Sequence, residues 1–263
     1  MMNKNELNRV LSKHLIWLNS KTRGEGQANL VGAHLHDVCL QGATLRRAIF
    51  RRADLSGAIL KAACMKRCDL SEANLTEADM GDADLCRADL SEAILEKASI
   101  VGAIFKRCDL SDTRMDDADA SQANFYQADL SGAHLARTLL VEAYMKEADL
   151  SECQLEDADL TGADLYSANF HEAEMQHAKL DGANMMKGNF SHVDLTGASL
   201  EGVHANGADF YKACLCGANL RGADLSRANL YKAKIGDADL TGARLYLAVM
   251  PDGTLNKTPD PTE

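Results

Sequence analysis

A large apolar residue recurs at every fifth position of this chain, without a slip in register, from Leu30 to Met250. The 45 residues at these positions are 28 Leu, 7 Met, 6 Phe, 2 Ile and 2 Ala, and they include every Phe of the protein. A small residue stands two positions before each of them, and it is Ala in 36 of the 45 cases. A five-residue period fits neither an α-helix of 3.6 residues per turn nor a strand with simple alternation. The pattern therefore excludes both ordinary elements over most of the chain.

The pattern instead predicts a chain that runs straight for a few residues and then turns a corner. Side chains two apart on an extended segment point to the same side, so the small and the large residue both face inward. The residue between them is Asp or Asn in 23 of 45 repeats, and Ser, Thr or Gly often follows the large residue. These residue types form turns, because their side chains bond to the local backbone or because they tolerate unusual dihedral angles.

A second period, of twenty residues, predicts how many repeats make one coil. Phe170, Phe190 and Phe210 are spaced by twenty, and so are Phe105 and Phe125. The triplet Asp-Leu-Ser also recurs by twenty, centred on Leu70, Leu90, Leu110, Leu130 and Leu150. Stacked identical side chains are typical of solenoids. Four repeats per coil then predict a squared tube of about eleven coils, about 53 Å long at the usual spacing between strands.

The repeat A-(D/N)-L-x-x, as in residues 53–57 and 163–167, resembles the pentapeptide-repeat family over residues 28–250. The resemblance implies a right-handed quadrilateral β-helix, in agreement with the coil predicted from the two periods. We therefore expect an all-β solenoid, a right-handed quadrilateral β-helix of about eleven 20-residue coils with an N-terminal α-helical cap. The resemblance alone does not specify a function, because one fold hosts many functions.

The two ends of the repeat region predict three parts of the chain. Residues 1–27 form a capping helix and a connector, residues 28–250 form the β-helix, and residues 251–263 form a C-terminal tail. The helix is expected over 3–19, where Asn3 and Glu6 resemble a capping box. One face of that helix is apolar and would cover the first coil; it carries Leu7, Val10, Leu11, His14, Trp17 and Leu18. At the other end, the apolar residues Tyr246, Leu247 and Val249 face outward, so either the tail folds back on them or a second copy covers them in a homodimer.

Composition and motifs exclude several classes of function. No apolar stretch approaches the roughly 18 residues of a membrane span, and the polar N-terminus does not resemble a signal peptide. The net charge of −11 argues against direct binding of nucleic acid by the surface as a whole. A solid tube offers no cleft for catalysis, and no phosphate-binding or metal-binding motif occurs. We therefore expect no enzyme activity, no cofactor and no metal; His171 and His192 would form only half of a zinc site.

The eight cysteines do not suggest a disulfide framework. Cys68, Cys108 and Cys153 occupy the position that is Ala in most repeats, so they are interpreted as small buried thiols. The others are expected to point outward, and Cys214 and Cys216 lie too close along an extended segment for good disulfide geometry. This usage favours reduced thiols and a cytoplasmic protein.

The twenty-residue period assigns charged residues to faces of the predicted tube. One face carries an acidic ladder of nine carboxylates in five successive layers, with no Lys or Arg among them: Asp69, Glu72, Asp89, Glu92, Asp109, Asp112, Asp129, Asp149 and Glu152. The preceding face carries a basic stripe of seven cations in four layers, against the single acid Asp84: Arg46, Arg47, Lys66, Arg67, Arg87, Lys106 and Arg107.

These stripes allow two interpretations. In the first, Asp and Asn brace the corners, and the basic stripe neutralises the acidic ladder across the shared edge, with about 0–1 kcal/mol for each exposed pair. In the second, the ladder faces a protein that normally binds an acidic polymer, because stacked like charges are otherwise destabilising. The second interpretation predicts a non-enzymatic scaffold that binds a protein partner through its charged faces.

The family resemblance adds an alternative function. Some pentapeptide-repeat proteins, the quinolone-resistance proteins and a mycobacterial relative, are DNA mimics that bind type II topoisomerases. The repeat and the negative charge of this chain are similar to theirs, which implies gyrase or topoisomerase IV as a partner. The chain departs from them in three respects: no loop interrupts its register, its C-terminus has no evident dimerising helix, and a basic stripe lies beside the acidic ladder.

Overall fold

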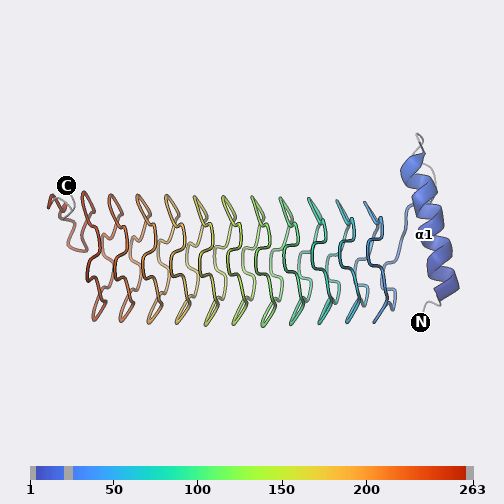
Figure 1. The fold of residues 1–263 in the computed structure, drawn as a ribbon, viewed down its shortest axis with the longest axis horizontal. Coiled ribbons are helices and arrows are strands. Elements are labelled where there is room, and N and C mark those ends of the chain that lie inside the picture. The colour runs from blue at the N-terminus through green and yellow to red at the C-terminus, as the bar shows by residue number, and fades with distance from the viewer. Residues whose placement is uncertain (1–3, 21–25, 259–263) are drawn as a thin grey trace.

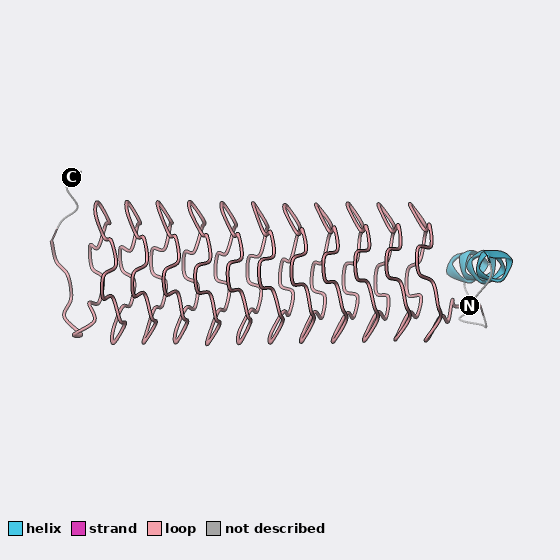
Figure 2. Ribbon diagram, turned by 90° about the horizontal axis from the view of Figure 1, so that it is seen from below, coloured by secondary structure: helices cyan, strands magenta, loops and turns pink. Residues whose placement is uncertain are grey.

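The protein is a straight tube with one helix set across its N-terminal end, in a computed structural model that describes residues 4–20 and 26–258. Figure 1 shows the coils stacked along the long axis, with helix α1 (Lys4–Asn19) at one end and the C-terminus at the other. Figure 2, turned by 90°, shows the same regular stack. Within the described residues, no helix is long and apolar enough to cross a membrane.

The coils are held in a twenty-residue register. Each bridge between layers joins a residue to the one twenty positions later, in parallel, and the series runs unbroken from Asn29 to Val249. The N–H of Leu90 donates to the carbonyl of Asp109 at 2.8 Å, and the N–H of Asp109 donates back to the carbonyl of Ala88 at 3.1 Å. Each side of a coil contributes a single bridging residue, so the described part of the chain holds no extended strand.

The corners explain why the repeat is five residues long. The N–H of the small residue donates to the carbonyl of the large residue three positions earlier, as from Ala93 to Leu90 at 2.9 Å. This turn places the residue two after each large one at positive φ, from Gly32 to Leu247. Most of these residues are not Gly, although the left-handed conformation costs an L-residue about 1–2 kcal/mol. The conformation is tolerated because the N–H of such a residue bonds to the next layer; the N–H of Glu92, for example, donates to the carbonyl of Ser111 at 2.9 Å.

The interior of the tube is filled by the residues at the two inward positions. Phe170, Phe190 and Phe210 stack with ring centroids 5.0 and 5.3 Å apart, and Phe105 and Phe125 stack at 5.1 Å. These five rings are fully buried. The stacks confirm that successive windows of twenty residues lie directly over one another.

Polar groups at the small position form hydrogen bonds with backbone carbonyls. The buried thiols of Cys68, Cys108 and Cys153 each donate to the carbonyl 23 residues earlier at 2.9 Å. The hydroxyl of Thr138 does the same with Met115 at 2.8 Å, and the hydroxyl of Thr113 donates to Leu110 at 2.7 Å. Such pairing allows polar atoms to be buried without a large penalty.

Helix α1 packs its apolar face on the first coil. Leu7 and His14 are buried, and Val10 and Leu11 contact the core. Asn3, part of the expected capping box, lies outside the described residues. The N–H of Ala28 donates to Nδ1 of His14 at 3.0 Å, which joins the helix to the first repeat. The pKa of His14 is lowered, because the effect of burial exceeds the opposing effect of nearby backbone carbonyls.

The described part of the C-terminal tail folds back on the last coil. Leu255 bridges to Val249 in antiparallel orientation, and the N–H groups of Leu247 and Asn256 donate to the carbonyls of Asn256 and Ala248 at 2.8 and 2.9 Å. This finding favours the first of the two alternatives for residues 246–249. Residues 259–263 of the expected tail lie outside the described residues.

Candidate functional site: charged faces of the tube

The acidic ladder is a straight column on one face. Asp69, Asp89, Asp109, Asp129 and Asp149 are joined by successive bridges, and the column continues to Asn169. In each layer the carboxylate accepts bonds from the Ser two positions later. For Asp109 these come from the N–H of Ser111 at 3.1 Å and from its hydroxyl at 2.6 Å. The aspartates therefore brace the turns of the acidic face.

The column changes its chemistry where Asn replaces Asp. The amide of Asn169 donates to the carboxylate of Asp149 at 2.8 Å, and the amide of Asn189 donates to the side-chain oxygen of Asn169 at 2.8 Å. An ionised Asp has no such donor. Asp149 thus gains a bond to the layer that follows it, whereas in the described part of the chain the five stacked aspartates form no side-chain hydrogen bonds with one another.

The remaining carboxylates of the ladder lie at the turns. Glu72 pairs with Arg52 of the layer before the ladder at 2.7 Å, and this bond lowers the pKa of Glu72. Asp112 lies over the next turn in its column, where a Cβ on Gly132 would come within 2.6 Å of its carboxylate. Among the described residues, Glu92, Asp112 and Glu152 form no ion pair within 4 Å.

The basic stripe surrounds a shallow hollow of about 320 Å³ on the adjacent face. Its lining consists of Arg46, Arg47, Lys66, Arg67, Cys86 and Arg87. Lys66 pairs with Asp84 at 2.7 Å. Burial alone would raise the pKa of Asp84, but hydrogen bonds from Lys66 and Cys86 lower it. Nε of Arg107 donates to Gln127 at 2.7 Å, and Lys106 lies 4.8 Å from the ring centre of Tyr126.

The two stripes share an edge but do not neutralise each other by contact. No ion pair joins the acidic ladder to the basic stripe in the part of the chain that the structure describes. The first interpretation of the charges had two parts. The structure shows the bracing of the turns, but within the described residues it shows no pairing of charges across the shared edge.

Other candidates for chemistry are spread over the surface. The rings of His171 and His192 lie 5.4 Å apart, and Nδ1 of His171 is 2.8 Å from the hydroxyl of Ser191. The described residues hold no group of three side chains that could bind a metal ion. All eight cysteines are free, with Cys68, Cys108 and Cys153 buried and Cys39 exposed.

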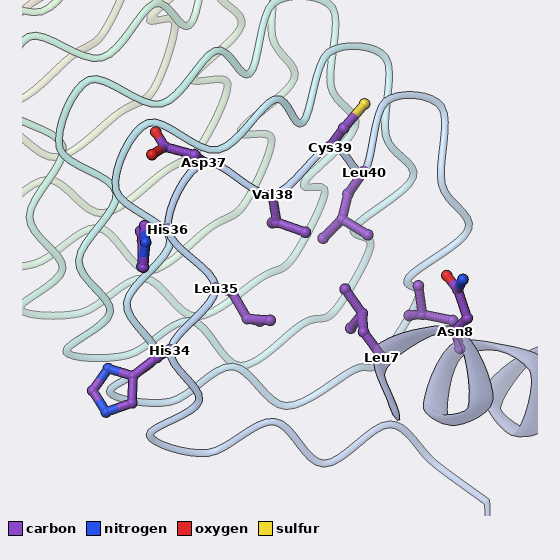
Figure 3. Close-up of a pocket in the computed structure, with 10 residues that line it drawn as sticks. Leu7, Asn8, His34, Leu35, His36, Asp37, Val38, Cys39 and Leu40 are labelled. Carbon is purple, nitrogen blue, oxygen red and sulfur yellow. The ribbon is translucent and has the colours of Figure 1, made fainter. Parts of the chain in front are cut away.

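Sequence reasoning missed two features. One is a groove of about 580 Å³ between α1 and the first coil, where Leu7 approaches Leu35, Val38 and Leu40 (Figure 3). The other is a set of tyrosines among the cations that follow the basic stripe: Tyr126, Tyr144 and Tyr166. The twenty-residue period places these tyrosines on the basic face, so this signal was present in the sequence.

The chain is similar in sequence to a known protein family. The model of the family described as pentapeptide repeats matches in eight copies over residues 28–67, 68–107, 103–140, 148–185, 189–222 and 215–245. Proteins of this family form right-handed β-helices, the fold class expected from the sequence. No curated protein matches the chain.

Three solved structures illustrate the similarity. HetL, a pentapeptide repeat protein involved in heterocyst differentiation regulation from the cyanobacterium Nostoc sp., is 34% identical over 97% of this chain and 100% of its own, with a TM-score of 0.41. A pentapeptide repeat protein from the Arabidopsis thaliana thylakoid lumen is 30% identical over 35% of this chain and 65% of its own, with a TM-score of 0.35. Full-length QnrB1, a plasmid-mediated fluoroquinolone resistance protein, is 18% identical over 80% of this chain and 92% of its own, with a TM-score of 0.30. Because the family model covers most of the tube, this chain belongs to the pentapeptide repeat family.

Proposed function

We propose that the protein is a non-enzymatic, cytoplasmic scaffold that binds a protein partner through its charged faces. The observation that supports this proposal is the acidic ladder, in which aspartates stack in five successive layers although Asn fits the same position. Stacked like charges destabilise a sheet. Binding of a partner with a basic surface would offset this repulsion and would explain why Asp rather than Asn occupies these positions.

The test compares two triple variants that retain the Asx turns. In the first, Asp89, Asp109 and Asp129 of the ladder become Asn. In the matched control, aspartates at the same repeat position of another face become Asn: Asp79, Asp119 and Asp159. Proteins captured from a native lysate by the wild type are identified by mass spectrometry, and their affinities for the purified variants are measured. Binding that is lost only in the ladder variant supports the proposal, and equal binding by both variants refutes it.

A second candidate function is a DNA mimic that binds a type II topoisomerase. It is favoured by the same ladder and by the net charge of −11, which resemble the charge of a nucleic acid strand. The assay is DNA supercoiling by gyrase and decatenation by topoisomerase IV, with and without a quinolone. Modulation or protection that disappears in the ladder variant would support the mimic, whereas no effect at a large molar excess would eliminate it.

Self-association through the C-terminal coil is part of the proposal. The tail covers one side of the last coil, and the apolar residues Ile235, Leu240 and Leu245 on its other sides are only partly buried. Incompletely covered ends of a solenoid are natural pairing surfaces. Light scattering tests this point, and a monomeric mass at high protein concentration would rule out the dimer.

A further inference from the structure

One of the four faces of the tube is positively charged. This basic face comprises residues 44, 46 and 47 and the residues that follow each at intervals of twenty, through 244, 246 and 247. It carries eleven Lys and Arg against four Asp and Glu, a net charge of +7, whereas the other three faces are each net negative. Its cations extend the basic stripe: Arg46, Arg47, Lys66, Arg67, Arg87, Lys106, Arg107, Lys146, Lys187, Arg227 and Arg244. The chain's net charge of −11 averages over faces that solvent screens from one another.

Four arginines form the most regular part of this face. Arg47, Arg67, Arg87 and Arg107 occupy the same turn position in successive layers, each at a positive φ between 57° and 62°. Layers lie about 4.8 Å apart, so their guanidinium groups project from a straight line. None of the four has an acidic partner within 4 Å in the described part of the chain. Three of them line the hollow of about 320 Å³.

Aromatic rings continue the face beyond the arginines. Tyr126 and Tyr144 lie with ring centres 6.0 Å apart. Lys106 lies 4.8 Å from the centre of the Tyr126 ring, and Tyr166 has Lys146 and Lys187 at 4.6 and 5.4 Å. A hydrogen bond from Lys187 lowers the pKa of Tyr166, which shows how cationic its surroundings are. Tyr144 is exposed, and Tyr126 and Tyr166 are half-buried. A row of cations followed by accessible rings is the combination that single-stranded nucleic acids bind, with phosphates on the cations and bases on the rings.

We propose that the basic face binds single-stranded nucleic acid lengthwise along the tube. The arginine column contacts the phosphates, for which the planar guanidinium is well suited, and the tyrosines contact the bases. A duplex curves its phosphates away from a flat face, whereas a flexible single strand follows a straight column. An acidic polypeptide would pair with the arginines, but its carboxylate side chains would not stack on the tyrosine rings as bases do. The proposal concerns a different face from the acidic ladder and does not depend on the function proposed above.

The experiment measures fluorescence anisotropy of a labelled oligo-dT of about fifteen nucleotides, a length in the range of known single-strand sites. The wild-type chain is compared with the variant Arg67→Glu/Arg87→Glu. The fold accepts Glu at this position of the repeat, because Glu72 and Glu92 occupy the same turn position on the neighbouring face. The control is Lys97→Glu/Arg137→Glu, with the same change of charge at the same turn position of another face. Because Arg137 pairs with Asp117 at 2.7 Å, circular dichroism first checks that this variant is folded.

The expected results are specific for the basic face. Four phosphate contacts predict that log K falls with log salt with a slope of about −3, and the loss of two predicts about −1.4. The Arg67→Glu/Arg87→Glu variant should bind at least about tenfold more weakly at low salt, and the control should bind as the wild type does. The oligonucleotide should also protect Cys86, which lies in the hollow, from alkylation, while Cys39 on another face stays reactive.

Three outcomes would overturn the proposal. The first is an oligonucleotide that does not bind even at about 50 mM salt, where phosphate contacts are strong. The second is equal loss of affinity in the variant and the control, which would indicate a charge effect of the whole chain. The third is a polyglutamate peptide that binds to the face more tightly than oligo-dT, which would assign it to acidic polypeptides instead.

Discussion

Replacing Asp109 with Asn should stabilise the tube, although it removes a charged group from an exposed position. The Asn oxygen can still accept the N–H and hydroxyl of Ser111, as the oxygen of Asn189 does from Ser191. The new amide gains a donor directed at Asp89 in the layer before. The pair Asn169 and Asp149 shows this bond in place at 2.8 Å.

The expected magnitude has two parts. One additional hydrogen bond contributes about 0.5–1.5 kcal/mol net. Asp109 also has a like charge in the layer on each side, at Asp89 and Asp129, about 4.8 Å away by the layer spacing. Each repulsion amounts to less than about 1 kcal/mol in water at that distance, and salt reduces it further. The variant should therefore be about 1–2 kcal/mol more stable at low salt.

The assay is urea unfolding followed by far-ultraviolet circular dichroism, at low salt and at about 1 M salt, where the Debye length is about 3 Å. High salt should remove the repulsion part of the gain and leave the hydrogen-bond part. The matched control is Asp119→Asn, because Asp119 lies between Ser99 and Leu139 and has no carboxylate above or below it in its column. A ladder variant that gains no more stability than this control would refute the reasoning.

Three other predictions concern the core, the cap and the thiols. Gly188→Ala should cost about 1–3 kcal/mol in thermal unfolding, a typical cost of overpacking, because the new Cβ would come within 2.5 Å of the Phe190 ring; Gly236→Ala, where the space is open, should cost far less. Burial lowers the pKa of His14, so the docking of α1 is stable above the ordinary imidazole pKa of 6.5 and weakens as the pH falls below it. Trp17 fluorescence should report this loosening, and a His14→Asn variant that keeps the same pH dependence would contradict it. Burial raises the pKa of Cys68 and Cys108 to about 12 and raises that of Cys153 as well. Iodoacetamide should therefore modify Cys39 in the native protein, and it should reach Cys68, Cys108 and Cys153 only in urea. Mass spectrometry that finds these three buried thiols modified without urea would contradict this interpretation.

The register of the tube could be predicted from sequence because the repeat leaves no alternative. A shift by one residue would turn every Leu outward, so the period alone assigns residues such as Phe170 and Phe190 to one stack. The positions of the acidic ladder and the basic stripe follow from the same arithmetic. The contacts of long side chains do not, because Arg and Lys reach several partners at similar cost. Thus the pairing of Lys66 with Asp84 and of Arg52 with Glu72 was not predictable.

Sequence by itself determined which residues point inward, which share a column and which charges gather on each face, since these follow from a repeated local geometry. Only the tertiary structure decided the rest. It showed that, within the described residues, the two charged stripes form no ion pairs with each other, and that a Cβ on Gly188 would come within 2.5 Å of the Phe190 ring. It also showed how the tail returns to the last coil and how His14 joins α1 to the first. These features depend on the conformations of individual side chains and on the two ends of the chain, whose sequences do not repeat, so no period encodes them.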